Sequence, residues 1–185
     1  MKNVIALGLV ALAGCSATSP RTVAGEPPPS AEESVLVLGV APANYAVTLA
    51  PGKLENGVFK AAAPAAALSR APKDGYIVAR VASGQELALT STTRLAQGAT
   101  PASAPFGACG AARTVVFAAQ RGKVVYLADV GYESMKGGGV DVRFERKLEK
   151  ARQYLAANYP ELAKLVTQGS YTFARTDASC KSAAR

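Results

Sequence analysis

Residues 114–130 read TVVFAAQRGKVVYLADV, and this stretch decides the fold expected for the 185-residue chain. Two apolar runs, 114–119 and 124–130, flank the polar sequence Gln-Arg-Gly-Lys, whose glycine suits a tight turn. Both runs are rich in β-branched and aromatic residues, and apolar residues occupy both of their faces. Strands of this kind are usually covered on both sides. The sequence therefore predicts a central β-hairpin in a mainly β fold.

Further strands are expected on both sides of this hairpin. The runs 76–81 and 86–92 flank Ala-Ser-Gly-Gln and predict a second hairpin, and Asn56-Gly57 has the two-residue turn signature of a third. A turn is also expected at residues 50–53. Short apolar or alternating runs predict four more strands, at residues 34–40, 45–49, 140–144 and 171–176.

The apolar period changes near the C-terminal end. From residue 145 on, apolar side chains recur at helical spacing, at Leu148, Ala151, Leu155 and Tyr159. Pro160 ends this helix and suits the first position of a second, shorter one that stops at Gly169. The apolar face of the second helix would hold Leu162, Leu165 and Val166. The expected fold is an antiparallel β-sandwich with a C-terminal helical hairpin, and the alternative is an open antiparallel α+β sheet with the helices on one face.

The composition narrows the chemistry. The chain contains no histidine, which excludes Ser-His-Asp and Cys-His catalysis and nearly every catalytic zinc site. The formal net charge is +8, from 21 basic and 13 acidic residues, and no aromatic-and-basic nucleic-acid motif accompanies it. We therefore expect no enzyme activity, no cofactor, no metal and no nucleic acid, and the basic balance indicates anionic partners.

Three carboxylates offer the remaining enzymatic hypothesis. Asp129 and Glu133 lie four residues apart on a predicted strand, and Asp141 follows a glycine-rich connector. Paired acids can serve glycoside hydrolysis or hold Ca²⁺. Acids at strand ends are more often solvated or paired with nearby bases, here Lys136 and Arg143, and we expect that structural role.

The first fifteen residues, MKNVIALGLVALAGC, have the layout of an export signal. Lys2 supplies a positive charge, residues 4–12 are apolar, and Leu12-Ala13-Gly14-Cys15 follows. The apolar run is shorter than the roughly 20 residues that span a membrane. This ending resembles the lipobox of bacterial lipoproteins. The resemblance implies that residues 1–14 are removed and that Cys15, the new N-terminus, carries a diacylglyceryl group and an acyl chain such as palmitate. An ordinary secretory signal and a buried strand are the alternatives.

The same resemblance predicts a location. Ser16, rather than an aspartate, follows the lipidated cysteine, and in lipoproteins this implies export to the outer membrane, with the protein on its periplasmic side. Residues 15–33 include three consecutive prolines and no apolar periodicity, so they are expected to form a flexible tether. Residues 34–185 are expected to form a single globular domain.

Cys109 and Cys180 remain once Cys15 is lipidated. In an oxidising compartment we expect them to form a disulfide. The bridge would close a loop of about 70 residues and contribute roughly 4 kcal/mol in the chain-entropy model. Two free, buried thiols are the alternative.

The region of the predicted helix holds the candidate contact surface. Its basic residues are Arg143, Arg146, Lys147, Lys150 and Arg152. Arg143, Lys147 and Lys150 are expected to share one helical side, away from the apolar stripe. Glu145 and Glu149 lie among them, so pairing along the helix is the simpler interpretation.

The pattern of apolar strand, glycine turn and apolar strand over residues 34–176 resembles small prealbumin-like sandwiches of bacterial envelope lipoproteins. We expect a non-enzymatic binding or structural module that contacts an envelope protein or anionic lipid headgroups. An envelope hydrolase that uses carboxylates and an accessory lipoprotein of a secretion or pilus machine are the alternatives.

Replacing Cys15 by Ser should leave the precursor unprocessed and unlipidated, because the thiol is the acceptor of the lipid. Metabolic labelling with a palmitate analogue should mark the wild type and a Cys109→Ser control, but not Cys15→Ser. Equal labelling of all three chains would rule out the lipobox.

Overall fold

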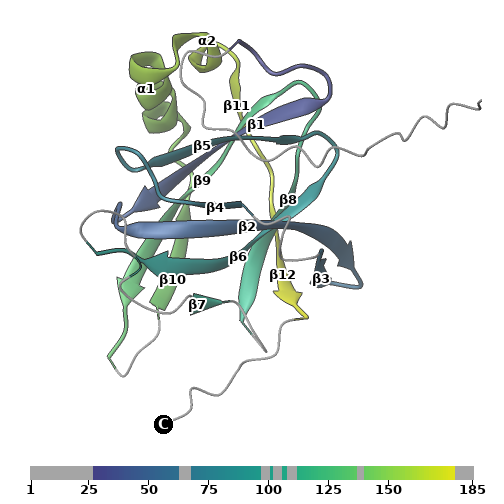
Figure 1. Ribbon diagram of the computed structural model, residues 1–185, viewed down its shortest axis with the longest axis vertical. Coiled ribbons are helices and arrows are strands. Elements are labelled where there is room, and N and C mark those ends of the chain that lie inside the picture. Colours follow the sequence, from purple (N-terminus) through teal and green to yellow (C-terminus); the bar gives the residue numbers. More distant parts are fainter. Residues whose placement is uncertain are drawn as a thin grey trace, which may run out of the picture.

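The protein is described here by a computed structural model that covers residues 27–62, 68–96, 101, 106–107, 112–136 and 140–177. The chain is mainly β, with two helices near its C-terminal end (Figure 1). This confirms the expected fold class at that level. Cys15, Cys109 and Cys180 lie outside the described residues, so the lipobox and the disulfide stay predictions.

β9 (Val124–Ser134) is the centre of a five-stranded sheet. β1 (Glu33–Ala41) pairs with one edge of β9 in parallel, and β5 (Tyr76–Ala82) pairs with β1 in antiparallel orientation. On the other edge of β9, β11 (Val166–Gln168) pairs in parallel with its first residues, and β10 (Val140–Glu145) pairs in antiparallel orientation with its C-terminal half. β9 is therefore hydrogen-bonded along both edges.

The second sheet has seven strands in the order β4-β2-β3-β12-β8-β6-β7. Their bounds are β2 (Tyr45–Glu55), β3 (Val58–Ala61), β4 (Leu68–Arg70), β6 (Glu86–Arg94), β7 (Phe106–Gly107), β8 (Arg113–Ala118) and β12 (Thr172–Thr176). Because β2 also pairs with β6, the strands β2, β3, β12, β8 and β6 close into a barrel-like ring. β4 and β7 extend the sheet by pairing with β2 and β6.

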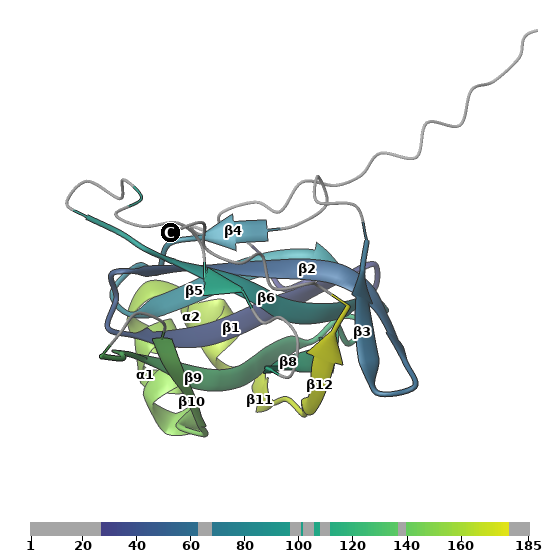
Figure 2. The ribbon, with the colours of Figure 1, turned by 90° about the horizontal axis from the view of Figure 1, so that it is seen from below.

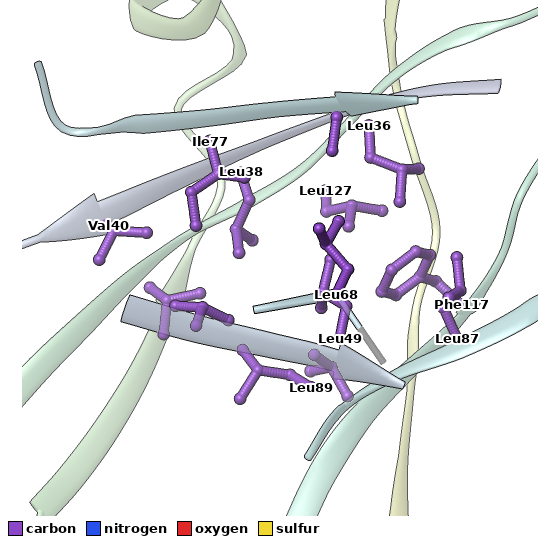
Figure 3. Close-up of a cluster of buried hydrophobic side chains, with 14 of the residues drawn as sticks. Leu36, Leu38, Val40, Leu49, Leu68, Ile77, Leu87, Leu89, Phe117 and Leu127 are labelled. Atoms are coloured by element: carbon purple, nitrogen blue, oxygen red, sulfur yellow. The ribbon is translucent and has the colours of Figure 1, made fainter. Parts of the chain in front are cut away.

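The two sheets bury one shared hydrophobic core (Figure 3). Leu36 of β1 and Leu127 of β9 meet Leu49 of β2 and Phe117 of β8 there, and each is at most 4% exposed. Neighbouring residues of a strand point to opposite faces. The side chains of the ring strands that point away from this core therefore bury a second, smaller cluster. It consists of Phe59, Ala88, Val116 and Ala174.

Two helices, α1 (Leu148–Asn158) and α2 (Pro160–Ala163), cover the opposite face of the five-stranded sheet. Leu155 of α1 is fully buried there, in one cluster with Val35 of β1 and Tyr126 of β9. Figure 1 shows the helices above β5 and β1, with β4 and β2 below these strands, and in Figure 2, seen from below, the helices lie behind β1 and β9. The five-stranded sheet is therefore a middle layer, with the helices on one side and the seven-stranded sheet on the other.

Two of the three predicted hairpins are wrong. β8 and β9 are neighbours in the sequence but belong to different sheets. The same is true of β5 and β6. Gly122 and Gly84 do form the expected turns, with φ of 62° and 77°, but each turn carries the chain from one sheet to the other. The physical reason is that a four-residue turn suits either connection, while strands that are apolar on both faces need cover from a second layer. The hairpin at Asn56-Gly57 is confirmed, since β2 and β3 pair around these residues, which have φ of 51° and 76°.

The purely antiparallel arrangement is also wrong. β9 pairs in parallel with β1 and β11, and β3 pairs in parallel with β12. The turn expected at residues 50–53 lies inside β2, where Gly52 lets β3 approach closely: a Cβ there would lie 2.2 Å from the carbonyl oxygen of Lys60. Glycine at this position serves packing, not a change of direction.

Two corrections concern the helical region. α1 begins at Leu148 rather than at residue 145, because the pairing of β10 with β9 continues to Glu145. Val166, expected on the apolar face of the second helix, starts β11, and Leu165 is 44% exposed. The parallel pairing with β9 prevails here over the helical spacing of the apolar residues.

Residues 27–33, which the sequence analysis assigned to the tether, contact the folded body. Arg80 of β5 is buried, and its guanidinium donates to the carboxylate of Glu33 at 2.8 Å and to the carbonyl oxygen of Pro27. The backbone N–H of Ser83 donates to the carbonyl of Glu32 at 3.0 Å. These bonds hold the entry of the chain into β1.

A β-bulge in β9 sets the position of Asp129. The register between β1 and β9 shifts between Val37, which lies opposite Tyr126, and Gly39, which lies opposite Asp129. The extra residue turns Asp129 toward the helix side of the sheet, where its Oδ1 accepts a hydrogen bond from the Tyr126 hydroxyl at 2.8 Å. A Cβ at Gly39 would lie 2.1 Å from the same oxygen. Glycine is therefore required in β1 by the close approach of this carboxylate.

Gly39→Ala should lower the free energy of unfolding by about 1–3 kcal/mol, because the new methyl group overlaps the Asp129 carboxylate. Urea unfolding of the two single variants and of the double variant, Gly39→Ala with Asp129→Ala, measures the coupling energy between these positions. The loss of unfolding free energy caused by Gly39→Ala should be smaller in the Asp129→Ala background. Gly131→Ala in β9 is the matched control, since its Cβ would meet nothing closer than 4.0 Å. Equal losses at positions 39 and 131 would contradict the proposed overlap.

Candidate functional site

The predicted basic run does not lie on one helical side. Arg143 is in β10, Arg146 and Lys147 connect β10 to α1, and Lys150 is in the first turn of α1. The expected alignment of Arg143, Lys147 and Lys150 is therefore wrong, because β10 extends to Glu145 and the helix starts later.

Most of the basic residues of this run form ion pairs with nearby acids, as expected from the hypothesis of pairing along the helix. Within the helix itself, however, the described residues contain a single pair from this run. Arg143 lies 3.0 Å from Glu133 and 3.3 Å from Asp141, across and along the β9–β10 hairpin. Lys147 pairs with Glu145, and this contact lowers the pKa of the Glu145 carboxyl and raises the pKa of the lysine. The helical pair joins Arg152 and Glu149 at 2.5 Å. All of these pairs are exposed or half-exposed, so solvent screens them and each contributes little to stability.

Arg146 and Lys150 form no ion pair within the described part of the chain. The guanidinium of Arg146 lies 5.4 Å above the ring of Tyr171, at a distance typical of a cation–π contact. Lys150, in the first turn of α1, is exposed. These two residues are therefore available to an anionic partner.

An aromatic cluster lies beside Arg146. The rings of Phe144, Tyr171 and Phe173 are packed with centroid distances of 5.6 to 6.1 Å. Phe173 is 48% exposed, and Val142, on the same face of β10 as Phe144, is 37% exposed. We call the set of Val142, Phe144, Arg146, Tyr171 and Phe173 the aromatic–basic surface.

Sequence reasoning missed this surface because its members come from distant segments. β10 and β12 belong to different sheets, and only the packing of the two sheets brings Phe144 to Phe173. The alternation of Tyr171 and Phe173 along a predicted strand was the available signal, since it places two aromatic side chains on one face.

The three candidate carboxylates do not converge. Glu133 and Asp141 lie opposite each other in the β9–β10 ladder, and both contact Arg143. Asp129 accepts its hydrogen bond from Tyr126, whose pKa is raised mainly by burial. The acids are engaged in structural contacts, so this arrangement offers little to a hydrolase mechanism.

An open depression of about 710 Å³ lies beside the β2–β3 hairpin. Three of its four charged side chains are already engaged: Lys60 lies 2.7 Å from Glu55, and Glu86 accepts the backbone N–H of Leu54 at 2.7 Å. The fourth is Lys53. Lys60 lowers the pKa of the Glu55 carboxyl, as expected for such a pair. The depression therefore presents one ion pair, a carboxylate bonded to the backbone and one lysine, rather than convergent reactive groups.

A smaller groove of about 290 Å³ lies between α1 and β5 and is lined by Tyr76, Tyr154 and Tyr159. The rings of Tyr76 and Tyr154 stack with centroids 4.5 Å apart. Burial raises the pKa of Tyr76 to about 12 and also raises the pKa of Tyr154, so both phenols are neutral at physiological pH. Tyr76 and Tyr154 pack against the cluster between the helices and the five-stranded sheet, so we assign these rings to packing between the two.

In the described part of the chain, no three Cys, Asp or Glu side chains come together as a metal site. No helix there is long and apolar enough to cross a membrane.

Two strands that lie close in the sequence to the predicted disulfide partners are paired with each other. Arg113 at the start of β8 lies opposite Arg175 in β12, in antiparallel orientation. Cys109 precedes Arg113 by four residues, and Cys180 follows Arg175 by five. The start of β8 and the end of β12 thus lie side by side, which is compatible with the predicted bridge.

No protein-family model, no curated protein and no solved structure matches the chain.

If Cys109 and Cys180 are joined, Cys109→Ser should lower the free energy of unfolding by roughly 2–4 kcal/mol and should expose one thiol. Alkylation of the denatured, unreduced protein followed by intact mass measurement counts free thiols. The wild type should take up no label after lipidation of Cys15, and the variant should take up one. Two labelled thiols in the wild type would contradict the bridge.

Proposed function

We propose that the protein is an outer-membrane lipoprotein whose folded domain is a non-enzymatic binding module for the phosphate-bearing surface of the membrane. The lipid on Cys15 holds the domain at the periplasmic side, and the aromatic–basic surface makes the contact. The observation that carries this proposal is the position of Arg146 over Tyr171, beside the exposed ring of Phe173.

The chemistry of the aromatic–basic surface fits lipid headgroups. Aromatic side chains with one polar end, such as Tyr171, are favoured at the level of the headgroups, and apolar groups such as Phe173 can reach the acyl boundary. Arg146 and Lys150 add positive charge, and each basic residue near an anionic membrane surface contributes about 1 kcal/mol. After removal of residues 1–14, which include Lys2, 20 basic and 13 acidic residues remain, and this positive balance acts in the same direction.

The tether supports the same proposal. Eleven residues lie between Cys15 and Pro27, the first described residue. Fully extended, such a segment spans about 40 Å, so the domain stays within reach of the membrane. A short flexible linker gives an effective concentration on the order of millimolar, at which a weak contact is populated.

For the fold, we propose that the domain is a prealbumin-like sandwich with additions. What supports this is the single core that the two sheets share. The helices, the parallel strands and the ring closure would be the additions. An accessory role in a secretion or pilus machine would be a special case of the same membrane-bound module.

The lipidated protein, reconstituted in vesicles, tests the membrane contact. Backbone hydrogen exchange at residues 144–147 and 171–175 should be slower in vesicles with about 30% phosphatidylglycerol than in neutral phosphatidylcholine vesicles. Such an anionic share creates a surface potential of tens of millivolts. The protection should decrease at high salt, because screening weakens contacts between exposed charges.

A charge-matched pair of variants separates a specific contact from general attraction. Arg146→Gln with Lys150→Gln should abolish most of the protection, whereas Arg121→Gln with Lys123→Gln, which removes the same charge from an exposed turn, should leave it unchanged. Equal exchange in both kinds of vesicle would refute the membrane contact.

A further inference from the structure

The outer edge of β10 is unpaired. β10 is the last strand in the order β10-β9-β1-β5, and within the described residues only β9 pairs with it. Asp141, Val142 and Arg143, in the middle of the strand, are all exposed. A free edge presents unpaired N–H and C=O groups to any other strand, and proteins usually restrict such pairing with charges.

The charges of β10 make the strand complementary to itself when Val142 lies at the centre of an antiparallel pairing. If Val142 lies opposite Val142 of a second copy, then Asp141 lies opposite Arg143 of that copy. Val140 then lies opposite Phe144, so apolar residues also meet on one face. Opposite charges and apolar pairs across two strands are both stabilising.

The neighbouring symmetric registers are disfavoured. A pairing centred on residue 141 places Asp141 opposite its own copy. A pairing centred on residue 143 places Arg143 opposite its own copy and Asp141 opposite Glu145. Like charges directly opposite each other destabilise a sheet. A pairing centred on Phe144 would place Arg143 opposite Glu145, but only residues 143–145 of the strand would then face each other, because β10 ends at Glu145. Charge and strand length together therefore favour the register centred on Val142.

The charge balance within one copy also favours this pairing. Asp141 lies opposite Glu133 in the β9–β10 ladder, which is a like-charge pair. Arg143 is the base in contact with both acids, at 3.3 Å and 3.0 Å. Arg143 of a second copy would provide Asp141 with a cation of its own.

We propose that β10 pairs with β10 of a second copy in antiparallel orientation, with Val142 at the two-fold axis, so that the five-stranded sheets of two molecules join edge to edge. The contact is isologous and closes at two copies. It does not depend on the proposed membrane contact, because it is made by the strand edge and can be observed whether or not headgroups are bound.

Disulfide crosslinking of the full-length protein in its native membranes tests this register. Val142→Cys places two thiols opposite each other at the axis, and oxidation should give a dimer on a non-reducing gel. Val140→Cys is the matched control on the same face of the same strand: its counterpart is residue 144, so it should not crosslink with itself. Co-expression of Val140→Cys and Phe144→Cys chains should restore the dimer band.

The charges provide a second, independent readout in the Val142→Cys background. Asp141→Arg should abolish the crosslink, because it places two arginines opposite each other, and Asp141→Arg combined with Arg143→Asp should recover it. Equal crosslinking of Val142→Cys and Val140→Cys, or no crosslinking of either, would overturn the proposal. So would a crosslink that survives Asp141→Arg undiminished.

Discussion

The requirement to cover β9 on both faces governs the rest of the structure. Val124, Val125, Tyr126 and Leu127 are each at most 3% exposed, although neighbouring residues of a strand point to opposite sides. Burial of apolar area stabilises a fold by roughly 25 cal/mol per Å², so neither face of β9 can be left in water without a large loss. One face meets the seven-stranded sheet, and the other meets α1 and α2. The three layers follow from this one strand.

The connections follow from the same requirement. The chain leaves the ring at the end of β8, turns at Gly122 and enters the middle layer as β9, and it makes the reverse crossing from β5 to β6 at Gly84. Tyr126 then links the strand to the helical layer, because its buried hydroxyl accepts the backbone N–H of Lys147 at 3.0 Å and donates to Asp129. The start of α1 is thus positioned by a side chain of the central strand.

The candidate surfaces lie where this cover ends. The C-terminal half of β9 carries β10 on one edge, and β10 is only partly covered by the opposite sheet, so Val142 and Phe173 remain exposed. The acids and bases of this hairpin neutralise one another, which leaves Arg146 and Lys150 as cations without a carboxylate partner in the described residues. The aromatic–basic surface and the free edge of β10 therefore lie next to each other, and both result from the incomplete cover of β10.

The sequence by itself determined most of the strands, the presence of α1, the hairpin at Asn56-Gly57 and the lack of histidine. These features depend on local periodicity, turn residues and composition. Only the tertiary structure decided that the strands around Gly84 and Gly122 separate into two sheets, since the local turn is the same in either case. The bulge at Asp129 and the glycine opposite it were also decided by the tertiary structure, because they depend on the pairing of two strands that are far apart in the sequence. The meeting of Arg146, Tyr171 and Phe144 likewise depends on how two sheets pack, and no spacing along the chain encodes it.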